Sequence, residues 1–399
     1  MNENALKIAV VGAGMGGLTA AIALTRIAGA DVTIFEQAKE LKEVGAGVQL
    51  TPNGERALNY LGLFDDVKKV TAEYDQPGIY RREDGTRIGE QVWTDSSGKY
   101  APLGLHRADF IDLLTSVIPQ ERILLQHRVK AVRDMTSSVE LEFENGSREE
   151  FDLVIGADGI HSTVRESMVG SSDPVYSGSV VYRGVVESAR LPKTWLMTHQ
   201  IWMGEGKHFM TYPVRQRKLI NFVGFMPRDE SVEESWSAEG NLDDLTTAFD
   251  GWDPELCQFI KLIERTNWWG LYDRLPLLDW TWGRVALLGD SAHAMLPHAG
   301  QGVNMAIEDS VSLAVLLEGV SSDRAAKALK SYEALRLDRT ASIQVASRRS
   351  GALYDSKKFD DRYDYTKAEE RDADLLEAKD FRRGVLYDFD AYLAAQNAP

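Results

Sequence analysis

The start of the chain constrains the fold most, and from Lys7 onward it reads KIAVVGAGMGGLTAAIALTRIAGADVTIFEQ. A nearly continuous apolar run that ends in glycine is typical of a buried parallel strand. The following stretch repeats apolar residues at the helical period and closes with a glycine, and DVTIFEQ predicts a second strand. The chain is therefore predicted to begin with a βαβ unit of a parallel α/β sheet.

The turn between the first strand and the helix has the spacing G-x-G-x-x-G, with Gly12, Gly14 and Gly17 at the defining positions. The first glycine permits a tight turn, the second lets a pyrophosphate approach the backbone, and the third lets the helix pack closely. The helix N-terminus directs its dipole at the phosphates. Glu36, with Gln37 beside it, ends the second strand and is placed to accept the hydroxyls of an adenosine ribose. This pattern predicts dinucleotide binding, and the acid argues against a 2′-phosphate.

A second glycine-rich segment, GDSAHAMLPHAGQGVNMAIED, lies in the last third of the chain. The preceding RVALLGD predicts a strand that ends at Gly289 and delivers Asp290 to the sheet edge where open α/β sheets bind ligands. Gly300 and Gly302 permit close backbone approach before a helix, whose N-terminus favours an electron-rich ligand. We expect the two segments to hold opposite ends of one ligand. A flavin dinucleotide fits, with adenosine at the first and the redox ring at the second.

The composition narrows the class of protein. The net charge is −16, and no Lys/Arg cluster suggests binding to nucleic acid or to a membrane surface. An anionic substrate would need a local positive pocket, because the average field repels it. The start MNENALK lacks the basic region of a signal peptide, and the single cysteine, Cys257, excludes an internal disulfide. We expect a cytoplasmic monomer or homodimer.

Between the two glycine-rich segments the pattern changes to short alternating strands. The stretch from Tyr176 to about Asn221 predicts an antiparallel sheet with one exposed face, and helices are expected over Pro52–Leu63 and Gln301–Leu317. The last 50 residues are charged and helical in character, and the sequence leaves open whether they form a cover or a partner surface. We predict three parts: a nucleotide-binding domain of residues 1–75, 101–175 and 270–345, a substrate-binding sheet domain of residues 76–100 and 176–269, and a C-terminal helical cover of residues 346–399.

Two smaller features have local explanations. The segment GADG follows the predicted strand FDLVI, and on its own it is best explained by a turn in which Asp158 caps the next helix. His293 and His298 flank the loop after Asp290 and are expected to bond to backbone. No His, Cys or Asp cluster has the spacing of metal ligands, so no metal is predicted.

As a set and in chain order, the motifs resemble those of the group A flavoprotein aromatic hydroxylases, which are single-component FAD-dependent monooxygenases. The motifs span nearly the whole chain and are VVGAGMGG with Glu36, GAGVQLTPN, HRADF, GADGIHSTVR, YPV and GDSAHAMLPHAGQGVNMAIED. The resemblance implies an α/β fold: a Rossmann-like FAD-binding domain, an interleaved antiparallel-sheet substrate domain and a C-terminal helical segment.

The resemblance also implies roles for single residues. Arg107 of HRADF would contact the FAD phosphate or ribityl oxygens, and Asp158 would serve FAD and nicotinamide binding. Asp290 matches the acid that contacts the ribityl chain. Pro297 would place its carbonyl near flavin and substrate, and Gln301 would lie at the reacting edge of the flavin.

Within this family the closest likeness is to salicylate, 3-hydroxybenzoate and 6-hydroxynicotinate hydroxylases. His208 and Tyr212 in KHFMTYPV carry the likeness, because they lie four apart on a predicted strand and share one face. In these relatives the histidine contacts the substrate hydroxyl, and an ordinary imidazole pKa suits it to accept that proton. Gln49 is assigned to cofactor binding. A glutamine at this position is more typical of the salicylate and 3-hydroxybenzoate enzymes. The tail LYDFDAYL looks more like the decarboxylating salicylate and 6-hydroxynicotinate enzymes.

The reaction implied by the resemblance has two halves. NADH or NADPH reduces FAD, and O2 then forms a flavin C4a-hydroperoxide that attacks a ring carbon ortho or para to a phenolate. If that carbon carries the carboxylate, CO2 is lost. We therefore expect hydroxylation of a small hydroxylated aromatic or heteroaromatic acid of the salicylate type, in aromatic compound catabolism. Alternatives are a 6-hydroxynicotinate 3-monooxygenase, a 3-hydroxybenzoate 6-hydroxylase, a flavin reductase or oxidase without hydroxylation, and a nucleotide-binding sensor.

Overall fold

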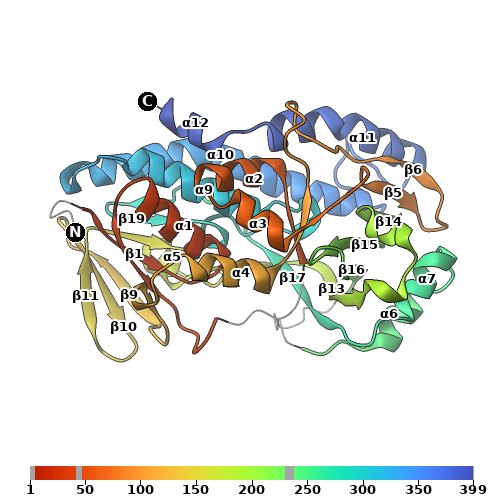
Figure 1. The fold of residues 1–399 in the computed structure, drawn as a ribbon, viewed down its shortest axis with the longest axis horizontal. Helices are drawn as coiled ribbons and strands as arrows, with labels where there is room; N and C mark the ends of the chain where they lie inside the picture. Colours follow the sequence, from red (N-terminus) through yellow and green to blue (C-terminus); the bar gives the residue numbers. More distant parts are fainter. Residues whose placement is uncertain (1–4, 42–46, 230–237, 399) are drawn as a thin grey trace.

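The computed structural model describes residues 5–41, 47–229 and 238–398. The first four residues of MNENALK and the first two of GAGVQLTPN lie outside the described residues. Figure 1 shows two sheet regions side by side, with long helices running along one side of both. The predicted α/β class and the antiparallel sheet between the two glycine-rich segments are confirmed.

The predicted βαβ unit lies at the centre of a mostly parallel sheet. In it β1 (Lys7–Val11) pairs in parallel with β2 (Asp31–Phe35) on one side and β12 (Leu153–Gly156) on the other, and α1 (Met15–Arg26) joins β1 to β2. The described strands follow the order β18-β19-β12-β1-β2-β8, with β8 at Ile123–Leu124, β18 at Thr281–Trp282 and β19 at Val285–Leu287. Because β1, β12 and β19 are parallel neighbours, their carboxyl ends meet at one edge. The turns after these strands carry the three glycine-rich motifs.

The second large sheet is assembled from distant segments. Among the described residues its strand order is β17-β13-β16-β15-β14-β5-β6, and its pairs are antiparallel except β14 with β5. Its strands are β5 (Ile79–Arg82), β6 (Arg87–Glu90), β13 (Val175–Glu187), β14 (Gln200–Gly204), β15 (Lys207–Val214), β16 (Leu219–Pro227) and β17 (Asn267–Asp273). The boundaries of the predicted domains stay a prediction.

The expectation that this sheet exposes one face is wrong. On one face Phe209 and Phe222 pack with Phe259 beneath α6 (Leu242–Ala248) and α7 (Pro254–Ile260). On the other face Met210 belongs to a buried cluster with Tyr354 from the C-terminal part of the chain. Helices that follow later in the sequence therefore cover both faces, which strand periodicity cannot show.

The remaining elements surround these two sheets. Two small sheets are formed by β9 (Val129–Asp134), β10 (Val139–Phe143) and β11 (Arg148–Phe151), and by β3 (Gly47–Leu50), β7 (Leu103–His106) and β4 (Ala72–Glu73). The predicted helices are confirmed as α2 (Pro52–Tyr60) and α9 (Gly302–Leu317). The other α-helices are α3 (Phe64–Val70), α4 (Arg107–Ser116), α5 (Thr163–Val169), α8 (Asp290–His293), α10 (Ser322–Tyr354), α11 (Ala368–Phe381) and α12 (Ala391–Gln396).

The C-terminal part of the chain links the two sheet regions. Helix α10 runs past both and contacts β19 as well as β14 (Figure 1). After α11 the chain forms a π-helical turn, Arg382–Tyr387, before α12 returns to pack against α9. No helix in the described residues has the length and apolar composition needed to cross a membrane.

Candidate functional site

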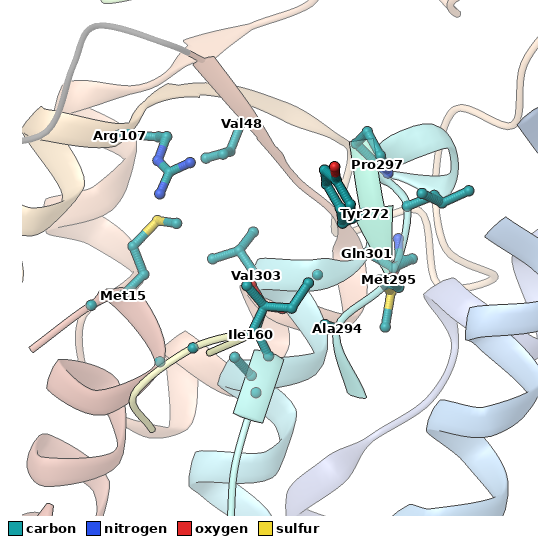
Figure 2. Close-up of a pocket in the computed structure, with 18 of the residues that line it drawn as sticks. Met15, Val48, Arg107, Ile160, Tyr272, Ala294, Met295, Pro297, Gln301 and Val303 are labelled. Carbon is teal, nitrogen blue, oxygen red and sulfur yellow. The ribbon is translucent and has the colours of Figure 1, made fainter. Parts of the chain in front are cut away.

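One continuous cavity of about 820 Å³ extends from the first glycine turn to the face of the seven-stranded sheet. This volume lies in the upper part of the range of ligand pockets, about 300–1,000 Å³. Figure 2 shows Met15 and Arg107 on one side of this space, Val303 near its middle, and Tyr272 and Pro297 on the other side. Of the predicted site residues, all but Gly17 and His208 line this cavity.

The first glycine turn has the geometry that the sequence predicts. Gly12 has a φ of +104°, and a Cβ there would lie 2.4 Å from the carbonyl oxygen of Ala157. A Cβ on Gly17 would lie 1.9 Å from the carbonyl oxygen of Gly12, so the third glycine permits the close packing of α1. A Cβ on Gly14 would meet nothing within 4 Å. The turn therefore leaves open space in front of a helix N-terminus, where a pyrophosphate fits.

Glu36 is fixed beside this turn. One of its carboxylate oxygens accepts a hydrogen bond from the backbone N–H of Ala13 (2.7 Å), and the other accepts one from Ala38 (2.8 Å). Each carboxylate oxygen can accept more than one hydrogen bond, so Glu36 keeps capacity for ribose hydroxyls. Gln37 also lines the cavity.

The second glycine-rich segment reaches the same cavity from the other strand. Gly289 and Gly300 have φ values of +63° and +64°, which allow the sharp turns before α8 and α9. The Asp290 side chain is exposed to the cavity, and Gly302, the first residue of α9, lines the cavity as well. Enclosure by the protein raises the pKa of Asp290, although His293 and Arg107 act in the opposite direction. The two glycine-rich segments thus line one cavity, as the sequence predicts.

A buried ionic network holds this second segment in place. The Asp309 carboxylate accepts hydrogen bonds from the backbone N–H of Gly289 (3.1 Å) and from Nε2 of His293 (2.6 Å). Arg336 on α10 pairs with Asp309 (2.8 Å) and with Glu308 (2.6 Å). The expectation that His293 bonds to backbone is wrong, because the Asp309 carboxylate, two helical turns into α9, is the stronger partner.

The loop between α8 and α9 places Pro297 and Gln301 at the cavity wall. The Gln301 side chain donates to Oγ1 of Thr51 (3.1 Å) and accepts from Nδ2 of Asn53 (3.1 Å). Gln49 lines the cavity opposite this loop, and its backbone carbonyl accepts a hydrogen bond from Asn304 (3.0 Å). The amide of Gln301 is therefore fixed by α2, and its role at the flavin edge stays a prediction.

Arg107 and Asp158 lie between the two ends of the cavity. Arg107 begins α4 directly after β7, and its side chain points into the cavity (Figure 2). Asp158 accepts hydrogen bonds from the hydroxyl of Ser162 and from the backbone N–H of Val164 (3.1 Å), so it caps the first turn of α5 together with Ser162, which is the N-cap residue. Burial raises the pKa of Asp158, and these hydrogen bonds oppose the shift. Cofactor binding by both residues stays a prediction.

The far half of the cavity contains polar residues that the sequence reasoning missed. His199, which opens the strand segment HQIWMG, lies there with its Nδ1 3.0 Å from Oε1 of Gln91. Burial and the nearby charge of Arg382 lower the pKa of His199 to about 3, so this imidazole is neutral at physiological pH. Tyr212 contacts His199 edge to face, and burial raises the pKa of Tyr212 to about 12. The sequence signal that could have identified His199 is its position as a polar residue at the start of an apolar strand.

His208 lies one layer behind the cavity wall. Its Nδ1 is 2.7 Å from the Asp355 carboxylate, so Nδ1 donates this bond. Its ring lies 5.2 Å from that of His298, which does line the cavity, and burial lowers the pKa of His298 to about 3. His208 and Tyr212 share a strand face, but four residues along a strand span about 13 Å. Direct contact of His208 with a substrate stays a prediction.

Comparisons with known proteins agree with this geometry. A family model described as FAD binding domain matches residues 5–347. A 3-amino-4-hydroxybenzoate 2-monooxygenase of Streptomyces platensis is 36% identical over 357 residues, covering 88% of this chain and 89% of the relative. A salicylate hydroxylase of Pseudomonas putida is 31% identical over 419 residues, covering 95% and 96%. The solved structure of a salicylate hydroxylase substrate complex superposes with a TM-score of 0.85 at 28% identity, covering 99% and 98%.

The residues present fit FAD. The open space at Gly14, the fixed carboxylate of Glu36 and the cavity-facing carboxylate of Asp290 match the pyrophosphate, the adenosine ribose and the ribityl chain. The family comparison independently indicates the same cofactor. The chain therefore belongs to the FAD-binding domain family and, within it, to the group A flavoprotein aromatic hydroxylases, which are FAD-dependent monooxygenases with NAD(P)H as co-substrate.

Proposed function

We propose that this enzyme hydroxylates a small benzoic acid that carries a ring hydroxyl, using NAD(P)H and O2. The observation that carries the proposal is the continuity of the cavity, which joins the two glycine-rich turns to a chamber on the seven-stranded sheet. The two curated relatives described above are named for substrates of this kind, 3-amino-4-hydroxybenzoate and salicylate.

The chamber has the lining that a benzene ring requires. Its walls are mainly apolar and come from the inner face of the sheet and the loop after α8: Ile201, Met210, Val223, Phe225, Trp269, Leu271, Met295 and Leu296. Tyr212, His199, Arg183 and Arg382 add polar groups to the same half of the cavity. A pocket of this composition binds an aromatic ring and uses a few polar contacts to orient it.

The protein's own contribution to the reaction is positioning, exclusion of water and proton transfer. When bound, FAD supplies the transfer of two electrons from NAD(P)H and the activation of O2. The apolar walls keep water from the reacting groups. An ionised ring hydroxyl makes the ortho and para carbons electron-rich, so the site must accept that proton. The hydrogen-bonded pair of His208 and Asp355 behind the wall is the histidine–carboxylate arrangement that we assign to this task, because the lowered pKa of His298 makes that imidazole itself a weak base.

The proposal is tested by incubating the FAD-loaded enzyme with NADH or NADPH, 18O2 and one ring acid at a time. The panel contains 3-amino-4-hydroxybenzoate, salicylate, 3-hydroxybenzoate and 6-hydroxynicotinate, and CO2 release is measured in parallel. We expect one 18O atom in a hydroxylated product of a hydroxybenzoate, in proportion to the NAD(P)H consumed. NAD(P)H oxidation that yields only hydrogen peroxide with every acid would contradict hydroxylation and favour an oxidase.

Replacing His208 tests the proton path. We expect His208→Gln to retain FAD and to lower the hydroxylation rate by about 100-fold, the usual contribution of a general base. Asp355→Asn, which removes the acceptor of the 2.7 Å bond, should lower the rate in the same direction. The measurement is single-turnover product formation from pH 6 to 9. A rate equal to that of the unaltered enzyme throughout this range would remove His208 from the path.

A further inference from the structure

Arg382 lines the far half of the cavity, although it comes from the C-terminal end of the chain. It is the first residue of the π-helical turn Arg382–Tyr387 that follows α11. Its side chain lies with Tyr354 and close to His199, at the end of the cavity away from the first glycine turn. Isolated π-helical turns occur frequently at functional sites. Residue 382 also lies beyond residues 5–347, the part of the chain that matches the family model.

Within the described residues, the charge of Arg382 is not balanced by a carboxylate. In the described part of the chain, no Asp or Glu lies within ion-pair distance of this guanidinium, which donates one hydrogen bond, from Nη2 to the hydroxyl of Tyr354 (2.6 Å). A guanidinium carries five N–H donors in a planar fork, so donors remain for a ligand. An enclosed cation without an anionic partner is costly, and a bound anion relieves this cost.

Other cationic groups of the cavity are engaged elsewhere. Arg183 donates to the backbone carbonyl of Gly47 and interacts with the hydroxyl of Tyr212. Arg107 lies near Asp290, on the flavin side. The imidazoles of His199 and His298 are neutral, since burial lowers the pKa of each to about 3. Arg183 keeps its charge, but its fork is occupied by neutral carbonyl and hydroxyl acceptors, whereas Arg382 retains donors for an anion in a protein whose net charge of −16 repels anions.

We propose that Arg382 binds the carboxylate of the aromatic acid in a two-point ion pair and thereby selects acids over neutral phenols. This inference rests on the proposed function for the class of substrate, and it assigns the recognition of the carboxylate to one residue. An arginine fork matches the two oxygens of a carboxylate, which fixes the orientation of the ring as well as its affinity. The C-terminal segment then contributes to substrate selection and not only to covering the sheet.

The test compares equilibrium binding of an acid and its uncharged analogue to the FAD-loaded protein. The probes are salicylate and 3-amino-4-hydroxybenzoate, each beside its primary amide, and binding is followed by the change in flavin absorbance. We expect Arg382→Gln to weaken binding of the acids by about 100-fold, as for loss of one partner of an enclosed ion pair, and to change amide binding by less than about 3-fold. Arg382→Lys should recover part of the acid preference, because it restores charge without the fork.

Arg383→Gln is the matched control, because Arg383 is the next residue of the same turn and does not line the cavity. It should leave the acid-to-amide ratio unchanged. Equal weakening of acid and amide in Arg382→Gln, or no weakening, would overturn the assignment. If Arg382→Gln does not retain FAD, the acid-to-amide binding ratio of Arg382→Lys is used instead. A ratio equal to that of the unaltered enzyme then overturns the assignment.

The two proposals fail in different ways. An unaltered enzyme that hydroxylates neutral phenols and binds neither acid supports aromatic hydroxylation and refutes carboxylate recognition by Arg382. An enzyme that binds the acids through Arg382 and yields only hydrogen peroxide refutes the proposed hydroxylation and retains the binding role.

Discussion

Replacing Arg336 by Met is expected to lower the free energy of unfolding by about 3–5 kcal/mol, the cost of breaking a buried ion pair from one side. Arg336 is fully buried and pairs with the equally buried Glu308 and Asp309. Arg339 still pairs with Glu308 (2.8 Å) in the variant, so the loss falls mainly on Asp309. Asp309 positions the N–H of Gly289 and the ring of His293, and the variant should therefore also bind FAD more weakly.

This prediction is tested by urea unfolding of the FAD-free protein, so that FAD binding does not mask the change in the free energy of unfolding. Lys330→Met on the same helix is the control. Its ammonium pairs with Glu333 in a half-exposed ion pair, and such pairs contribute about 0–1 kcal/mol. An unfolding free energy for Arg336→Met within 1 kcal/mol of the control would show that the network does not stabilise the fold.

Gly14→Val is expected to raise the dissociation constant of FAD by at least about 100-fold while the fold stays intact. The new side chain enters the open space in front of α1 and displaces the pyrophosphate from backbone donors, whose charge-assisted hydrogen bonds contribute about 1.5–3 kcal/mol each. Gly14 has a φ of −71°, which any residue adopts, and a Cβ there meets nothing within 4 Å. The protein should therefore be stable and colourless.

The measurement is titration of FAD-free Gly14→Val with FAD, followed by flavin fluorescence, beside thermal unfolding. Gly17→Ala is the contrasting variant, because its Cβ would lie 1.9 Å from the carbonyl oxygen of Gly12. That substitution should destabilise the fold itself. A Gly14→Val protein that binds FAD with unaltered affinity would place the pyrophosphate elsewhere.

The parts of the site that are continuous in sequence could be predicted from it. The turn at Gly12–Gly17 and the segment from Gly289 to Gly302 each combine a strand end, glycines and a helix start within a few residues. Parallel pairing of β1, β12 and β19 then places their carboxyl ends together, which follows from the handedness and burial of such sheets. The local sequence patterns were therefore sufficient to predict that both glycine-rich segments line one cavity.

The far half of the cavity could not be predicted in the same way. His199 and Arg382 are separated by nearly half of the chain and meet only because the segment after α11 packs back over the sheet. Neither belongs to a motif. Strand periodicity correctly placed His208 and Tyr212 on one face, but it carries no information on how far the cavity extends along that face. The partner of His293 is set by the packing of α9 in the same manner.

The central claim is that one FAD molecule is held at its two ends by the turn after β1 and the segment after β19. The most direct test is calorimetric titration of FAD-free Asp290→Ala with FAD and, separately, with ADP, which contains the adenosine and pyrophosphate half alone. We predict that Asp290→Ala weakens FAD binding by about 100-fold, the loss of charge-assisted hydrogen bonds to one carboxylate, and leaves the affinity for ADP within about 3-fold of the unaltered protein. Unaltered FAD affinity, or an equal loss for FAD and ADP, would contradict it.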